Sequence, residues 1–189
     1  LLGGSDNKVI TDITISINPI EKMVNDAQKY TNAGFSELKI KAGLEAKHDV
    51  AAISAILDVI NDNSVLKLDA NQGWTLKRAI SFMNKFNDSK LVMLEQPLPY
   101  TNQTDNALIR SNISQDLILD ESVHSAKDAF HVLQNGAVDV VNIKLMKSDG
   151  LFSAEAINRV AESAGAECMI GCMAETRLGI AAAVHFAAA

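Results

Sequence analysis

Short runs of apolar and β-branched residues alternate along the chain with longer segments in which apolar residues recur every three or four positions. The first pattern is typical of buried strands and the second of amphipathic helices. We predict strands at Ile10–Ile17, Glu37–Lys41, Val65–Asp69, Leu91–Glu95, Leu117–Asp120, Val138–Lys144 and Glu167–Cys172. We predict helices at Ile20–Ala33, Lys47–Ile60, Thr75–Phe86, Ala126–Gln134, Leu151–Ala164 and Arg177–Ala189, with a short one near Ala107–Ile113.

The predicted strands end at even intervals, roughly 25 residues apart, which fits compact βα units. An open doubly wound sheet would alternate in the same way, but its ligand would gather at one switch point. Nearly every strand here ends in a candidate functional residue, which favours an α/β barrel of the TIM type whose strand ends surround one mouth. Seven of eight strands are predicted. We therefore expect residues 1–189 to form one partial (β/α)8 barrel domain, truncated at its C-terminal end, within a longer protein or closed by a partner.

Composition and charge narrow the classes of protein. The 189 residues are 48% hydrophobic, enough for one domain with a sizeable core, and the net charge of −6 argues against a nucleic-acid groove. No apolar run approaches the roughly 18–20 residues that cross a bilayer, and the first six residues lack the regions of a signal peptide. Cys168 and Cys172 fit no disulfide framework or zinc motif. We expect a cytoplasmic protein with reduced cysteines, a small-molecule substrate, and no nucleic-acid or membrane partner; a homo-oligomer is left open.

Three acidic residues, Asp69, Glu95 and Asp120, each end a successive predicted strand. Parallel strands bring these ends to one rim, where three carboxylates would repel one another unless a cation lay among them. Carboxylate oxygens with room for water and substrate suit Mg²⁺. Each carboxylate could instead cap the helix that follows it. Three carboxylates at the ends of three successive strands favour a metal site over three separate helix caps.

Two lysines, Lys39 and Lys41, share one face of a predicted strand because alternate residues point the same way. Burial and neighbouring positive charge would lower a lysine pKa and make one of them a general base, unless the strand lies at an edge and exposes both. Lys144 ends the sixth strand, which lies opposite the second in an eight-stranded barrel, so we expect Lys41 and Lys144 to face each other. Two such bases would invert a carbon centre, with the metal stabilising the enolate charge. We expect Lys147 to be a loop or helix-start charge.

Five segments resemble motifs of the enolase superfamily, and more narrowly of its muconate-lactonizing-enzyme subgroup, in the family's order. They are Lys39–Lys41, Leu68–Trp74, Leu94–Pro97, Leu119–Ser122 and Asn142–Lys144. The resemblance implies that Asp69, Glu95 and Asp120 bind Mg²⁺, that Lys41 and Lys144 are the acid/base pair, and that Lys39 tunes Lys41.

Two further segments, Val141–Ser148 and Cys168–Gly179, are most similar to those of dipeptide epimerases, notably of the L-Ala-D/L-Glu type. Asp149-Gly150 stands where a Gly-Gly pair is usual, and we expect it to change only a loop. The family also carries an N-terminal capping domain and an eighth strand with an Asp-x-Asp motif that binds the dipeptide ammonium. Neither is found in the 189 residues, so we expect the chain to hold the chemistry and lack much of the specificity.

The resemblance therefore implies an isomerase: a Mg²⁺-dependent epimerase that inverts the α-carbon beside the carboxylate of a dipeptide by two-base 1,1-proton transfer through an enolate. We place Asn71, Cys172, Met173 and Glu175 in the substrate pocket. The alternatives are an o-succinylbenzoate synthase, an N-succinylamino-acid racemase or a cycloisomerase of the same subgroup, and a non-catalytic fragment.

Overall fold

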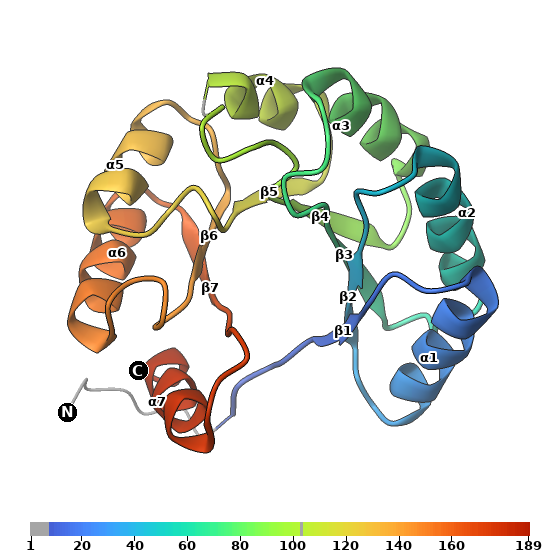
Figure 1. The fold of residues 1–189 in the computed structure, drawn as a ribbon, viewed down its shortest axis with the longest axis horizontal. Helices are drawn as coiled ribbons and strands as arrows, with labels where there is room; N and C mark the ends of the chain where they lie inside the picture. Colours follow the sequence, from blue (N-terminus) through green and yellow to red (C-terminus); the bar gives the residue numbers. More distant parts are fainter. Residues whose placement is uncertain (1–7, 103) are drawn as a thin grey trace. The chain divides into compact units, whose positions relative to one another are not determined.

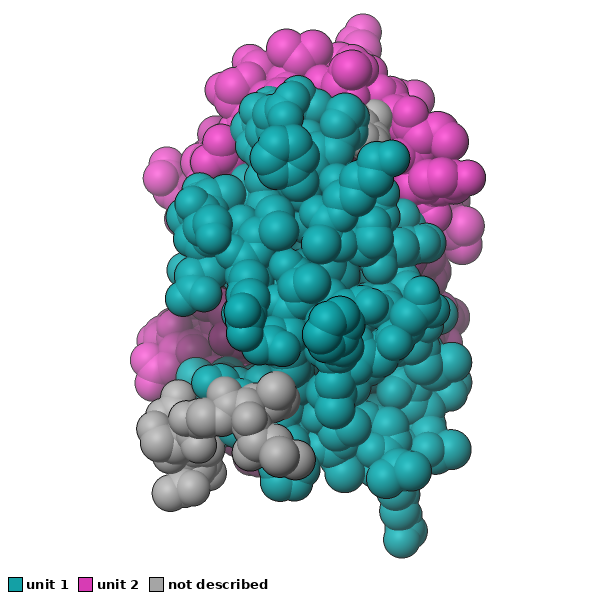
Figure 2. Space-filling view, turned by 90° about the vertical axis from the view of Figure 1, so that its left-hand side faces the viewer, with its two compact units in different colours: residues 1–10, 118–189 teal, residues 11–117 magenta. Residues whose placement is uncertain are grey.

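The computed structural model describes residues 8–102 and 104–189 of the chain. They divide into two compact units, coloured separately in Figure 2. Unit 2 is Thr11–Leu117, and unit 1 is Ile118–Ala189 together with the described residues up to Ile10. The expectation about a signal peptide concerns the first six residues, which lie outside the described ranges. We describe each unit by itself.

Unit 2 alternates strands with helices (Figure 1). Its strands are β1 (Ile13–Ile15), β2 (Glu37–Lys41), β3 (Val65–Asp69) and β4 (Leu91–Glu95), and its helices are α1 (Ile20–Asn32), α2 (Ala46–Leu57), α3 (Leu76–Met83) and α4 (Thr104–Asn112), with a 3₁₀ turn, η1, at Asn84–Phe86. Neighbouring strands are parallel, and their register sets Lys41 opposite Asp69 and Asp69 opposite Glu95. The carboxyl ends of β2, β3 and β4 therefore lie side by side.

Unit 1 continues the same alternation. The boundary falls within β5 (Asp116–Leu119), which is followed by α5 (Ala126–Gln134), β6 (Val140–Ile143), α6 (Leu151–Ser163), β7 (Glu167–Ile170) and α7 (Arg177–Ala187). β6 is parallel to both β5 and β7, with Val141 between Leu119 and Cys168. The predicted order of strands and helices is confirmed in both units.

The core of unit 2 lies between its strands and helices. Leu38 and Ile40 of β2 are buried in it together with Ile53 and Ile56 of α2. Side chains alternate across a strand. The residues of β2 that alternate with Leu38 and Ile40, which are Glu37, Lys39 and Lys41, therefore point to the other face of the sheet. The apolar face thus fixes β2 in place and sets its charged residues on the face away from the helices.

Several element boundaries follow from local chemistry. Thr75 accepts a hydrogen bond from the Arg78 N–H at 3.3 Å, and Ser125 accepts one from the Asp128 N–H at 3.3 Å, so α3 and α5 begin directly after these caps. The predicted bounds of β2, β3, β4 and α5 are confirmed. The predicted strand Ile10–Ile17 is too long, because only its three central residues pair with β2.

Both cysteines are free thiols, as expected. Cys168 lies half-buried in β7 and Cys172 is exposed just beyond it. Among the described residues, no helix combines the length and apolarity needed to cross a membrane.

Candidate functional site

A cluster of two lysines and two carboxylates lies at the carboxyl ends of β2, β3 and β4. The Lys39 Nζ donates to Glu95 Oε2 at 2.6 Å and lies 2.9 Å from Asp69 Oδ2. Asp69 and Glu95 are fully buried, and only 10% of the Lys39 side chain is exposed. One ammonium group is therefore shared by two carboxylates that have no access to water.

Lys41 is the more accessible lysine of this cluster, with 30% of its side chain exposed. Its Nζ donates to Asp69 Oδ2 and to Asn71 Oδ1, both at 2.7 Å. The Asn71 N–H donates in turn to Asp69 Oδ1 at 2.9 Å, and its φ of 40° lies in the left-handed region that asparagine tolerates. Asn71 thus joins the site by holding the Lys41 ammonium.

The prediction that burial and like charge would lower a lysine pKa is wrong for Lys39. Burial acts in that direction, but the charges of Glu95 and Asp69 and their hydrogen bonds outweigh it and raise the Lys39 pKa. The prediction considered only the strand that carries the lysines. The register brings carboxylates from the next two strands to the same place.

A second cluster lies at the ends of β5 and β6 in unit 1. Asp120 directly follows β5 and is buried, and Lys144 directly follows β6. The Lys144 Nζ donates to Asp120 Oδ2 at 2.5 Å, and the Lys147 Nζ donates to Asp120 Oδ1 at 2.7 Å. Each carboxylate oxygen thus accepts a hydrogen bond from a different lysine.

The two lysines keep Asp120 ionised. Burial alone would raise the Asp120 pKa, but the charge of Lys147 and the hydrogen bonds from Lys144 and Lys147 lower it below its ordinary value. The pKa of Lys147 is also lowered, because its burial outweighs the attraction of Asp120.

Lys147 lies in the loop between β6 and α6, as predicted, but it is buried. It is not a solvated loop charge, since only 9% of its side chain is exposed and it contacts Asp120. The Lys147 N–H donates to the Lys144 carbonyl at 2.9 Å, so the chain turns back immediately after β6. The spacing Lys-x-x-Lys across a tight turn is the signal that could have paired the two lysines.

Two alternatives from the sequence are overturned. The caps of α3 and α5 are Thr75 and Ser125, so Asp69 and Asp120 do not cap these helices. The lysines of β2 are not on an edge, because β2 pairs with β1 on one side and with β3 on the other.

The predicted metal ligands divide between the units. Asp69 and Glu95 lie together in unit 2, and Asp120 belongs to unit 1. In the part of the chain that the structure describes, no three His, Cys, Asp or Glu side chains form a ready-made metal-binding group. A metal role for the three carboxylates stays a prediction.

Three predicted pocket residues, Cys172, Met173 and Glu175, lie on the loop between β7 and α7. Cys172 and Met173 are exposed, whereas the Glu175 Oε1 accepts a hydrogen bond from the Met173 N–H at 3.0 Å. The carboxylate of Glu175 therefore folds back on its own loop.

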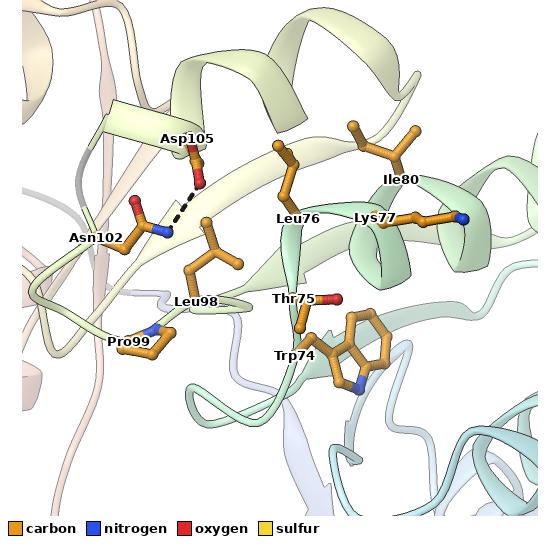
Figure 3. A pocket seen from close by; sticks show the side chains of 9 residues that line it. All are labelled: Trp74, Thr75, Leu76, Lys77, Ile80, Leu98, Pro99, Asn102 and Asp105. Carbon is orange, nitrogen blue, oxygen red and sulfur yellow. Dashed lines mark hydrogen bonds between the residues drawn. The ribbon is translucent and has the colours of Figure 1, made fainter.

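A separate groove of about 670 Å³ lies in unit 2 between the start of α3 and the loop after β4 (Figure 3). Its lining includes Leu76, Ile80, Leu98 and Pro99, and at its end Asn102 and Asp105 are joined by a hydrogen bond of 2.9 Å. None of the lysines or carboxylates of the first cluster lines it.

Parallel βα units with charged residues at the strand ends define the class of (β/α)-barrel domains, and the described residues form seven such strands. A model of the family "Enolase C-terminal domain-like" matches residues 22–189. The chain belongs to this family, as its motifs indicated.

Curated relatives of the chain include epimerases. The chain is 43% identical to a hydrophobic dipeptide epimerase of Enterococcus faecalis and 42% identical to an L-Ala-D/L-Glu epimerase of Bacillus subtilis, in each case over 100% of its own length. It covers 54% and 52% of those proteins, so the chain spans about half the length of the curated relatives it matches.

Solved structures show the same similarity. A crystal structure of the E. faecalis dipeptide epimerase complexed with Mg and the dipeptide L-Leu-L-Tyr matches with a TM-score of 0.96 at 43% identity, over 100% of this chain and 53% of that one. A substrate-liganded complex of the B. subtilis epimerase matches with a TM-score of 0.95 at 42% identity, over 99% of this chain and 53% of that one.

Proposed function

We propose that the protein containing this domain is an isomerase: a Mg²⁺-dependent dipeptide epimerase that inverts the α-carbon beside the terminal carboxylate. The observation that carries the proposal is that each unit sets lysine ammonium groups on buried carboxylates at strand ends. The similarity to dipeptide epimerases supports the choice of substrate class.

The donor set suits a hard divalent cation. Asp69 and Glu95 are fully buried carboxylates on neighbouring strands, and the Lys39 ammonium lies within 2.9 Å of both. Buried carboxylates in such a position require a positive charge. We propose that these two residues and Asp120 hold Mg²⁺, which when bound neutralises the negative charge that develops on the substrate carboxylate.

We propose Lys41 and Lys144 as the acid/base pair. Lys41 contacts Asp69 and Lys144 contacts Asp120, so each lysine lies at a strand end beside a carboxylate proposed to bind the cation. Lys39, which shares Asp69 Oδ2 with Lys41, would tune Lys41 through that oxygen.

The proton transfer balances without a redox partner. One lysine amine takes the α-proton, the C–H electron pair moves toward the carboxylate, and the other lysine ammonium returns a proton to the opposite face. The opposite placement of Lys41 and Lys144 rests on the strand count, in which the second and sixth strands of eight face each other.

Four other expectations stay predictions: the extent of the catalytic domain, residues 1–189 as a barrel truncated at its end; the cytoplasmic location; the absence of nucleic-acid and membrane partners; and a homo-oligomer. The pocket roles of Asn71, Cys172, Met173 and Glu175 also stay predictions.

The full-length protein, incubated in D₂O with Mg²⁺ and either L-Ala-L-Glu or L-Leu-L-Tyr, tests the proposal. We expect deuterium at the α-carbon of the C-terminal residue, followed by NMR, and none after treatment with EDTA. Lys41→Ala and Lys144→Ala should each abolish exchange from one epimer, in opposite senses, whereas Lys22→Ala, at an exposed helix position, should leave both rates unchanged. The proposal is wrong if the wild-type protein exchanges no α-proton of any dipeptide offered at any Mg²⁺ concentration.

A further inference from the structure

Lys147 lies in an ordered turn between β6 and α6. Its N–H and that of Ser148 donate to the Lys144 carbonyl at 2.9 and 3.0 Å, and the Ser148 hydroxyl donates to the same oxygen at 3.0 Å. Ser148 is fully buried. The turn therefore holds Lys147 at the ends of β5 and β6.

All three hydrogens of the Lys147 ammonium have an acceptor. These acceptors are Asp120 Oδ1 at 2.7 Å, the Asp120 carbonyl at 2.5 Å and the Asn142 carbonyl at 2.8 Å. An ammonium group offers three donors and no more. Lys147 thus has no donor left for a substrate, which excludes it as a substrate-binding lysine in this arrangement.

Two of these three bonds fix the Asp120 side chain. Because the ammonium binds both the side-chain Oδ1 and the main-chain carbonyl of Asp120, it closes a ring that sets the rotamer of that residue. The Asn142 carbonyl anchors the ammonium to β6. The other carboxylate oxygen, Oδ2, accepts from Lys144.

We propose that Lys147 is a positioning residue: it holds Asp120 through Oδ1 and so presents Oδ2, the oxygen now bound to Lys144, to a divalent cation. The inference rests on the function proposed above and deepens it. Lys147 holds one carboxylate oxygen of Asp120, and Lys144 binds the other. In this arrangement Lys147 positions the Asp120 carboxylate, and Lys144 is the residue that takes part in acid/base chemistry.

Replacing Lys147 by methionine removes its charge and also its contacts to Asp120. These two losses should change the affinity for a cation in opposite directions. Removing a positive charge beside a cation site would tighten cation binding by simple electrostatics. Releasing the Asp120 side chain would weaken it, because groups that orient metal ligands typically contribute about 10–100-fold to metal affinity or activity. The sign of the change therefore separates the two accounts.

The experiment titrates the full-length protein with Mn²⁺, followed by electron paramagnetic resonance of the free ion. We compare the wild type with Lys147→Met, Lys147→Arg and Asp120→Asn. Lys127→Met, at an exposed position of α5, removes the same charge without touching Asp120. Circular dichroism checks that each variant is folded, and Lys147→Arg keeps the charge if Lys147→Met does not fold.

We expect Lys147→Met to raise the Mn²⁺ Kd by about 10-fold or more, Lys147→Arg to raise it less, and Lys127→Met to leave it unchanged. An unchanged or lower Kd in folded Lys147→Met, or in Lys147→Arg if that is the only folded variant, overturns the positioning role. The titration does not depend on which dipeptide is a substrate. Weaker Mn²⁺ binding without any exchange in D₂O would thus support the role of Lys147 and refute the epimerase, whereas exchange with unchanged Mn²⁺ binding would do the reverse.

Discussion

Replacing Lys39 by methionine would remove the ammonium group between Asp69 and Glu95 and keep most of the apolar stem of the side chain. In the cation-free protein, the two carboxylates are fully buried and Lys39 lies 2.9 and 2.6 Å from them. Lys41 still binds Asp69 at 2.7 Å, so the loss falls mainly on Glu95. Removing one partner of a buried ion pair costs about 3–5 kcal/mol, and for a chain of this size the melting temperature would fall by on the order of 10 °C.

The pH dependence of this loss has a definite sign. The Lys39 pKa is raised in the folded protein, so its contribution to stability is fully present below the ordinary lysine pKa, about 10.4, and is lost only as the pH rises through the higher folded value. The stability deficit of Lys39→Met should therefore shrink between pH 8 and pH 11.

Urea unfolding of the full-length protein in EDTA, followed by circular dichroism at pH 8 and pH 11, measures both effects. Lys22→Met is the control, because its exposed ion pair with Asp26 on one helix contributes little to stability. Adding Mg²⁺ should recover part of the deficit if the cation binds the same carboxylates. An unchanged urea midpoint at pH 8, or an equal deficit at both pH values, would show that Lys39 does not neutralise this pair.

Three further outcomes follow from the geometry. A Cβ on Gly43, whose φ is +116°, would lie 2.5 Å from a main-chain carbonyl oxygen of the loop after β3, so Gly43→Ala should destabilise the protein by about 1–3 kcal/mol in urea unfolding. A Cβ on Gly171 would lie 3.0 Å from Lys144 Cε, so Gly171→Ala should slow deuterium exchange from the epimer served by Lys144 more than from the other. Burial, with a nearby carboxylate, raises the pKa of the Cys168 thiol to about 11, and iodoacetamide at pH 8 should therefore label the exposed Cys172 first, as peptide mass spectrometry would report.

The strands of unit 2 could be predicted from local pattern because both of their faces are constrained. Apolar residues such as Leu38 and Ile40 must face the helices, and this alternation fixes where Lys39 and Lys41 point. The first strand was predicted too long because its ends depend on where its pairing with another strand stops. The residues on either side of Ile13–Ile15 have the composition of a strand, but pairing with β2 stops there, and no local pattern reveals where a partner ends.

The contacts of the charged residues were less predictable than their positions. The raised pKa of Lys39 depends on Asp69 and Glu95, which lie on two other strands and reach it only through the parallel register. The burial of Lys147 depends on a turn that brings it back to Asp120. Both are consequences of tertiary placement, and a sequence pattern restricted to one element contains no information about them.

The lysines of the two clusters connect stability with the proposed chemistry. Without a cation, Asp69, Glu95 and Asp120 would be buried charges, and the ammonium groups bound to them make that burial tolerable. A cation that engaged the carboxylates would take over this pairing and leave Lys41 and Lys144 available for the proposed proton transfer. Lys147 differs from these two because its hydrogens also bind two main-chain carbonyls. It would therefore keep its place on Asp120 while Lys144 takes part in the proposed proton transfer.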